Sequence, residues 1–150
     1  MRTLLVTSSL VLALFSAATS AQNADAIDAP RITQQAFKKL VAAHNVIIVD
    51  TRRAETFAEG HIRGALLLPL EGSLTWPDES ESVVAVLIKT RKPVVTYCAC
   101  SDEATAARAA LMLQARGVKN VKALRGGWNE WVKAGNPVVT STKSTKSGPK

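Results

Sequence analysis

The sequence predicts an α/β domain with a mostly parallel central sheet and helices on both faces, and two observations lead to this prediction. First, short runs of aliphatic and β-branched residues alternate along the chain with amphipathic or alanine-rich segments of helical period. Second, the run at residues 46–49 is apolar at every position, which is typical of a strand buried on both faces. Strands that alternate with helices pair in parallel, because each helix carries the chain back across the sheet.

Each element follows from local signals in the chain. Thr33 can cap a helix over residues 34–44, in which Phe37, Leu40 and Val41 share one face. A short polar helix over residues 54–59 is expected to end at Gly60. Further strands are expected at residues 65–68, 94–97 and 121–124, further helices at residues 83–89, 104–116 and 127–134, and a polar loop at residues 72–82.

The two ends of the chain differ in composition from the middle. Residues 1–21 carry one Arg, then an apolar stretch and then small residues, which is the order of a secretory signal peptide. The apolar stretch at residues 10–15 is far shorter than the ~20 residues that span a bilayer. We therefore predict export, most simply to a bacterial periplasm, with no stable membrane insertion after cleavage. Residues 22–30 are assigned to a linker, residues 31–139 to the domain, and the polar, basic residues 140–150 to a disordered tail.

Composition and charge exclude several classes of protein. A chain of 150 residues that is 47% hydrophobic is long enough for one ordinary domain and is not a wholly disordered polar chain. Two cysteines are too few for a disulfide-dense mini-protein. The net charge is +7, but Arg2, Lys143, Lys146 and Lys150 supply four of these charges at the ends of the chain. The body is only mildly basic, so we expect no nucleic-acid partner.

The residue types that carry chemistry gather where the strand at 94–97 turns into the helix that begins near residue 104. Cys98 and Cys100 lie in this turn. Backbone N–H groups at the start of a helix form a cradle for anions, so a thiol held there is more readily ionised. A thiolate is the nucleophile of sulfur, disulfide and phosphate-ester chemistry. The alternative is that one or both cysteines are small apolar residues buried at the strand end.

Several ordered motifs resemble those of rhodanese domains. They are residues 49–52 (VDTR), 57–65 (FAEGHIRGA), Pro69, 97–105 (YCACSDEAT), 117–121 (GVKNV), 124–128 (LRGGW) and Trp131. The resemblance covers residues 32–138, nearly the whole predicted domain. It implies a rhodanese-like fold and a single-domain sulfurtransferase that carries sulfane sulfur as a cysteine persulfide. It also implies that no metal or organic cofactor is needed.

The resemblance leaves two candidate nucleophiles. Aligning Tyr97 with the family's Tyr-Cys pair selects Cys98, whereas counting back from Gly117 over the family's helix length selects Cys100. Cys100 also leaves a loop of the family's usual size, and loop size matters because the ring of amides must surround one sulfur-bound anion. We therefore favour Cys100 as the catalytic nucleophile, with Cys98 as the alternative. The substrate-binding loop is then formed by Ser101, Asp102, Glu103, Ala104 and Thr105.

The predicted loop departs from the family pattern in its charge. With Cys100 as the nucleophile, Glu103 stands where the family carries Gly, and Thr105 stands where Arg is common. Asp102 and Glu103 bring negative charge to a site that should attract thiosulfate, unless a carboxylate points outward and caps the helix start. We therefore expect thiosulfate to be a poor donor.

Asp50 and Arg52 are assigned supporting roles. Asp50 ends a buried strand, where a carboxylate needs hydrogen-bond donors, and Arg52 and loop amides can supply them. The resemblance implies that His61 is structural rather than a catalytic base. His44 and His61 lack ligand spacing with the cysteines, so no metal site is predicted.

The predicted function is that of a sulfurtransferase or sulfur carrier. The expected partners are a small sulfur donor such as thiosulfate, a thiol or cyanide acceptor, and a protein thiol. Two alternatives remain open, namely a catalytically weak rhodanese-fold module that binds a partner and a thiol–disulfide redox protein that uses Cys98 and Cys100. A phosphatase is disfavoured, because such enzymes use a Cys-x5-Arg loop and the residues six positions after the two cysteines are Ala104 and Ala106.

Overall fold

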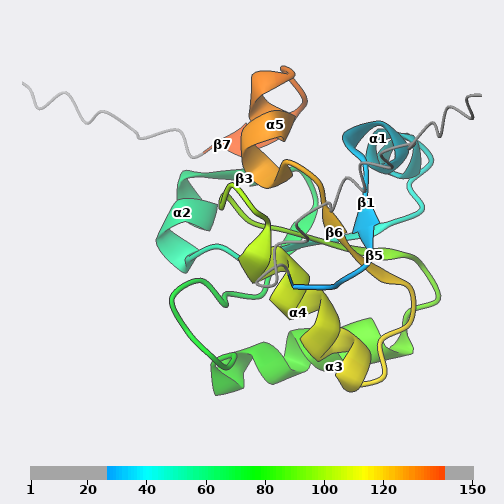
Figure 1. Ribbon diagram of the computed structural model, residues 1–150, viewed down its shortest axis with the longest axis vertical. Coiled ribbons are helices and arrows are strands. Elements are labelled where there is room, and N and C mark those ends of the chain that lie inside the picture. The colour runs from blue at the N-terminus through cyan, green and yellow to red at the C-terminus, as the bar shows by residue number, and fades with distance from the viewer. Residues whose placement is uncertain (1–26, 141–150) are drawn as a thin grey trace, which may run out of the picture.

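The computed structural model describes residues 27–140 (Figure 1). The predicted signal peptide, the first part of the predicted linker and residues 141–150 lie outside the described residues. At the centre is a five-stranded sheet in which all paired strands run parallel. Its strands, in spatial order, are β1 (Arg31–Ile32), β6 (Val121–Leu124), β5 (Val94–Tyr97), β2 (Ile47–Asp50) and β4 (Ala65–Leu67).

Helices cover both faces of this sheet (Figure 1). One apolar cluster joins the sheet to α3 (Glu81–Lys89) and α4 (Ala104–Ala115), and a second joins it to α1 (Gln34–Ala42) and α5 (Gly127–Lys133). The shorter α2 (Ala54–Glu59) and the 3-10 helix η1 (Asp78–Ser80) complete the helical elements of the described chain. This arrangement confirms the predicted α/β class with a mostly parallel sheet.

Side-chain alternation along β5 decides where the first cysteine lies. Successive side chains of a strand point to opposite faces of the sheet. Val94 belongs to the α3–α4 cluster, whereas Val95 and Tyr97 belong to the α1–α5 cluster. Cys98 continues this pattern directly after the strand, and its side chain lies in the α3–α4 cluster.

The alanine-rich face of α4 packs close against the sheet. Ala106, Ala107, Ala109 and Ala110 are all fully buried, and small side chains let a helix backbone approach its neighbour. The Thr96 hydroxyl of β5 donates to the carbonyl oxygen of Ala106 at 2.8 Å. The start of α4 is thereby fixed relative to the end of β5, which are the two elements that flank the cysteines.

Besides the short strand β1, two features of the fold were not predicted from the sequence. A second, two-stranded antiparallel sheet pairs β3 (Gly60–Ile62) with β7 (Val138–Thr140). Residues 27–30, which the sequence analysis assigns to a linker, pack against the domain: Ala29 is 5% exposed, and the Ala123 N–H donates to the carbonyl oxygen of Pro30 at 2.8 Å. Within residues 27–140, no helix is both long and apolar enough to cross a membrane.

Candidate functional site

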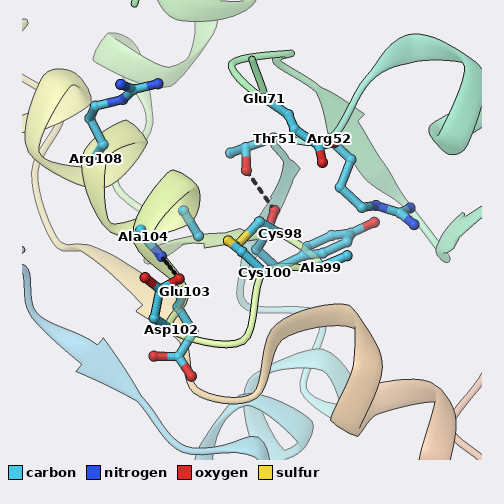
Figure 2. Close-up of a disulfide and its surroundings, with 12 residues drawn as sticks. Thr51, Arg52, Glu71, Cys98, Ala99, Cys100, Asp102, Glu103, Ala104 and Arg108 are labelled. Atoms are coloured by element: carbon cyan, nitrogen blue, oxygen red, sulfur yellow. Dashed lines mark hydrogen bonds between the residues drawn. A yellow bond between two sulfur atoms is a disulfide. The ribbon is translucent and has the colours of Figure 1, made fainter. Parts of the chain in front are cut away.

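The candidate site lies at the carboxyl end of β5, in the short loop that leads into α4 (Figure 2). Cys98 is 2% exposed and lies at the strand end, whereas Cys100 is half-buried in the loop. A disulfide joins the two residues, whose Cα atoms are 5.7 Å apart. In parallel α/β sheets, ligand sites form outside the carboxyl ends of the strands, so the two sulfur atoms occupy the position expected for chemistry.

The loop after Cys100 turns tightly into the helix. The Glu103 N–H donates to the carbonyl oxygen of Cys100 at 3.3 Å, and the Ala104 N–H donates to the Asp102 carboxylate at 3.1 Å. The N–H groups of Thr105 and Ala106 have no acceptor among the described residues. Free N–H groups in the first turn of a helix stabilise a nearby anion. The loop therefore offers donors that could stabilise a negatively charged sulfur.

The two acidic side chains of the loop take donors from the protein itself. Asp102 accepts the Ala104 N–H, which is the capping arrangement that the sequence analysis considered. The Glu103 carboxylate accepts the Gly126 N–H at 2.8 Å and the Arg31 guanidinium at 3.3 Å. Figure 2 shows the Glu103 side chain pointing away from the two sulfur atoms. The charge of Glu103 is thus compensated by Arg31 and is directed away from the cysteines.

The start of α5 holds the segment between the cysteines. The Trp128 N–H donates to the carbonyl oxygen of Cys98 at 2.9 Å, and the Asn129 side-chain amide donates to that of Ala99 at 2.8 Å. Gly127 has φ +46 and lies against the same Cys98 carbonyl, where a Cβ atom would clash with it. On the other side, the backbone N–H and the hydroxyl of Thr51 both donate to the Tyr97 carbonyl oxygen at 2.9 Å.

Next to this loop in the chain is Tyr97, with which the predicted supporting residues form a buried network. Asp50 is fully buried and accepts hydrogen bonds from the Arg52 backbone N–H at 2.9 Å and from its guanidinium at 2.6 Å. The Tyr97 hydroxyl donates to the same carboxylate and accepts the Ile62 N–H at 3.1 Å. Arg52 also donates to the carbonyl oxygen of Gly60 at 2.7 Å. The network ties the ends of β2 and β5 to β3.

Burial and the charge of Asp50 shift the titration of both of its partners. Burial raises the pKa of the Tyr97 hydroxyl, and the neighbouring Asp50 charge and hydrogen bond raise it further. Burial alone would lower the pKa of Arg52, but its hydrogen bonds and ion pair with Asp50 raise it overall. Tyr97 therefore stays neutral and Arg52 stays charged at physiological pH. Arg52 supports the site as a permanent buried cation, 4.1 Å above the Trp128 ring centroid.

The predicted loop residues 101–105 follow Cys100 directly and lead into α4, and Figure 2 shows Asp102, Glu103 and Ala104 beside the two cysteines. Asp50 ends the neighbouring strand β2 and is bonded to Arg52. Sequence reasoning missed the bonding roles of Tyr97 and Thr51 and the contact between Gly127 and Cys98. The tyrosine at the end of a predicted buried strand was the available signal, because a buried hydroxyl needs a partner. The His61 ring nitrogen Nδ1 lies 2.9 Å from the carbonyl oxygen of Phe57, and its ring stacks on the Phe57 ring, which is a structural arrangement.

The chain is similar in sequence to parts of curated proteins. The chain is 32% identical over 84 residues to the uncharacterized protein YqhL of Bacillus subtilis, covering 56% of this chain and 59% of that protein. It is 35% identical over 82 residues to a tRNA uridine(34) hydroxylase of Xanthomonas oryzae, covering 55% of this chain and 31% of the hydroxylase. The chain thus spans less than two thirds of the length of either curated relative.

A solved structure and a family model both match the described domain. A crystal structure of a rhodanese-related protein from Thermoplasma volcanium superposes with a TM-score of 0.59 at 20% identity, covering 75% of this chain and 99% of that one. The family described as the Rhodanese-like domain matches residues 33–134, which contain β2, β5, α4 and the cysteine loop. The chain therefore belongs to the rhodanese-like domain family.

Proposed function

We propose that this protein is a sulfurtransferase or sulfur carrier in which Cys100, in its reduced form, carries sulfane sulfur as a persulfide. The observation that carries the proposal is the position of Cys100, half-buried in a loop that follows a buried strand and precedes α4. Membership of the rhodanese-like domain family supports the same chemistry. Cys98 is 2% exposed, so a donor from solvent meets Cys100 first.

The proposed reaction has two steps. The Cys100 thiolate attacks the outer sulfur of thiosulfate, the donor's S–S bond breaks, and sulfite leaves with the bonding electron pair. The resulting persulfide anion is stabilised by the first-turn N–H groups of α4, including those of Thr105 and Ala106. An acceptor such as cyanide or a thiolate then attacks the outer sulfur and regenerates the Cys100 thiolate. The oxidised form joins Cys98 to Cys100, so a thiol must first reduce the disulfide.

The charge arrangement bears on the choice of donor. Arg31 compensates the Glu103 carboxylate, but Asp102 is exposed at the mouth of the loop. We therefore propose that thiosulfate reacts slowly as a sulfur donor. We propose that the natural reactant is an uncharged sulfur donor or a protein thiol. The exported location that residues 1–21 predict belongs to the same proposal, because an oxidising compartment would favour the disulfide between reductive cycles.

A single-turnover assay with thiosulfate tests the proposed function. The reduced, full-length protein should release sulfite in a burst, and an alkylation quench should trap an added sulfur of about 32 Da on the Cys100 peptide. Cys100→Ser should abolish the sulfite burst, whereas Cys98→Ser should retain it. Full retention in Cys100→Ser would mean that Cys98 is the nucleophile. If no sulfite is released and neither cysteine carries the added sulfur, a rhodanese-fold module that binds a partner is the better hypothesis.

A further inference from the structure

The feature that the proposed reaction leaves unexplained is Cys98. Cys98 has no part in the two-step reaction above, yet it is the residue to which Cys100 is bonded. It lies in the apolar α3–α4 cluster, and only 2% of its surface is exposed. A purely structural role would need only a small apolar residue at this position. The disulfide shows instead that its sulfur reaches the sulfur of Cys100, which is a half-buried residue.

We propose that Cys98 is a resolving nucleophile, which makes this protein a thiol-dependent releaser of sulfide. The inference rests on the proposed persulfide at Cys100 and adds a second fate for it. The Cys98 sulfur attacks Cys100 Sγ, the bond between Sγ and the outer sulfur breaks, and the outer sulfur leaves as HS⁻ with the bonding pair. The Cys98 thiol proton goes to the leaving sulfur, which already carries the negative charge of the persulfide anion.

The electron balance of this step is closed. The sulfane sulfur gains two electrons and becomes sulfide, while the two cysteine thiols lose two electrons and become the Cys98–Cys100 disulfide. A small thiol or a protein dithiol then reduces the disulfide through a mixed disulfide. The first attack of that reductant falls on Cys100, because it is the more exposed of the two cysteines.

The geometry favours this internal route over attack by a molecule from solvent. Cys98 is fixed in position, since its carbonyl accepts the Trp128 N–H at 2.9 Å and packs against Gly127. The following residue is held as well, since Asn129 donates to the carbonyl oxygen of Ala99 at 2.8 Å. The 5.7 Å between the two Cα atoms lies within the range that a disulfide requires without backbone movement. A nucleophile held in place in this way has a high effective concentration at its target.

Burial also determines the order in which the two cysteines react. A donor from solvent cannot reach Cys98 at 2% exposure, so Cys98 reacts only through Cys100. The group that resolves the persulfide is then part of the protein, the sulfur leaves as sulfide, and the reductant, rather than a sulfur acceptor, is the co-substrate. Thiosulfate together with a thiol would give sulfite, sulfide and an oxidised thiol.

The test follows both products in one single turnover. Full-length protein is reduced, freed of reductant and mixed with thiosulfate, and sulfite, sulfide and free thiols are measured. The wild type should release sulfite and then roughly one sulfide per sulfite, with the loss of two thiols. Cys98→Ser should keep the sulfite burst and release no sulfide, and the adduct on Cys100 should persist until cyanide or a thiol is added.

Two controls separate chemistry from folding. Ala110→Ser places a hydroxyl in the same apolar cluster as Cys98→Ser but keeps both cysteines, so it should release sulfide like the wild type. If Cys98→Ser does not fold, the wild type alone decides: trapped persulfide should rise and then decay as the alkylation-resistant disulfide appears. A wild-type persulfide that persists without sulfide, or sulfide release at the wild-type rate in Cys98→Ser, overturns the inference. Absence of sulfite from the wild type would instead overturn the proposed function.

Discussion

Glu103 combines two opposing effects at one position of the cysteine loop. Its backbone adopts φ 57 and ψ 19, the left-handed conformation that costs a residue with a side chain about 1–2 kcal/mol. Its carboxylate, in return, accepts hydrogen bonds from the Gly126 N–H and from Arg31, and so fastens the loop to β1 and to the start of α5. A glycine at this position would avoid the backbone cost but would lose both bonds. The sequence predicted an added charge, but the long-range partners that compensate it could not be predicted from local spacing.

Substitutions at Glu103 separate the two effects. Glu103→Ala keeps the left-handed strain and loses both hydrogen bonds, so its free energy of unfolding should fall by about 2 kcal/mol. Glu103→Gly loses the same bonds but relieves the strain, so it should be more stable than Glu103→Ala by about 1 kcal/mol. Urea unfolding of the reduced proteins measures both differences. Equal stability of the Ala and Gly variants would show that the backbone strain at this residue is negligible.

At the scale of elements, the sequence predicted those whose signals are local. The predicted helices and the strands near residues 47, 65, 94 and 121 are present, with ends that differ by at most two residues. The missed strands β1, β3 and β7 have only two or three residues each. Their existence depends on partners far along the chain, since β1 pairs with β6 and β3 pairs with β7. The strand β4 is equally short but lies in the apolar run at residues 65–68, whereas β1, β3 and β7 lie in no such run and so give no local signal.

The start of α5 is the element boundary that matters most for the cysteines. Gly127→Ala adds about 1 kcal/mol of left-handed strain at φ +46 and a clash with the Cys98 carbonyl worth about 1–3 kcal/mol. Gly135→Ala is the matched control, because Gly135 lies just beyond the other end of α5 at φ +69 with open space around its Cβ position. We expect a clearly larger loss of unfolding free energy for Gly127→Ala in urea. Equal losses of unfolding free energy in the two variants would show that the contact between Gly127 and the Cys98 carbonyl does not limit the residue at position 127.

At the scale of the whole molecule, the buried network of Asp50, Arg52 and Tyr97 joins the two sheets. Asp50 closes β2, Tyr97 closes β5, and both reach β3 through Arg52 and the Ile62 N–H. Loss of one charged partner in such a buried pair typically costs about 3–5 kcal/mol, because the other charge is left uncompensated. The sequence predicted that Arg52 would serve Asp50, since both lie in one short motif. It could not predict that Tyr97, 47 residues after Asp50, shares the same carboxylate.

Alkaline titration tests this network through its effect on stability. Tyr97 has a raised pKa in the folded state, whereas an unfolded tyrosine ionises near pH ~10. Above that pH the unfolded chain loses a proton that the folded protein keeps, so stability should fall by up to about 1.4 kcal/mol per pH unit. The stability contribution is therefore complete below pH ~10 and is lost progressively above it. Tyr97→Phe should lack this particular slope, although lysines and other groups still titrate in both proteins.

The chain contains one tyrosine, so tyrosinate absorbance reports on this residue alone. In the wild type, tyrosinate should appear only together with the unfolding transition that circular dichroism detects, because the folded protein keeps Tyr97 buried between Asp50 and the Ile62 N–H. An ionisation midpoint near pH ~10 in protein that is still folded would contradict a desolvated Tyr97 beside a carboxylate. Coincidence of the two transitions would instead show that Tyr97 ionises only when the protein unfolds, as expected for a hydroxyl held in the buried network.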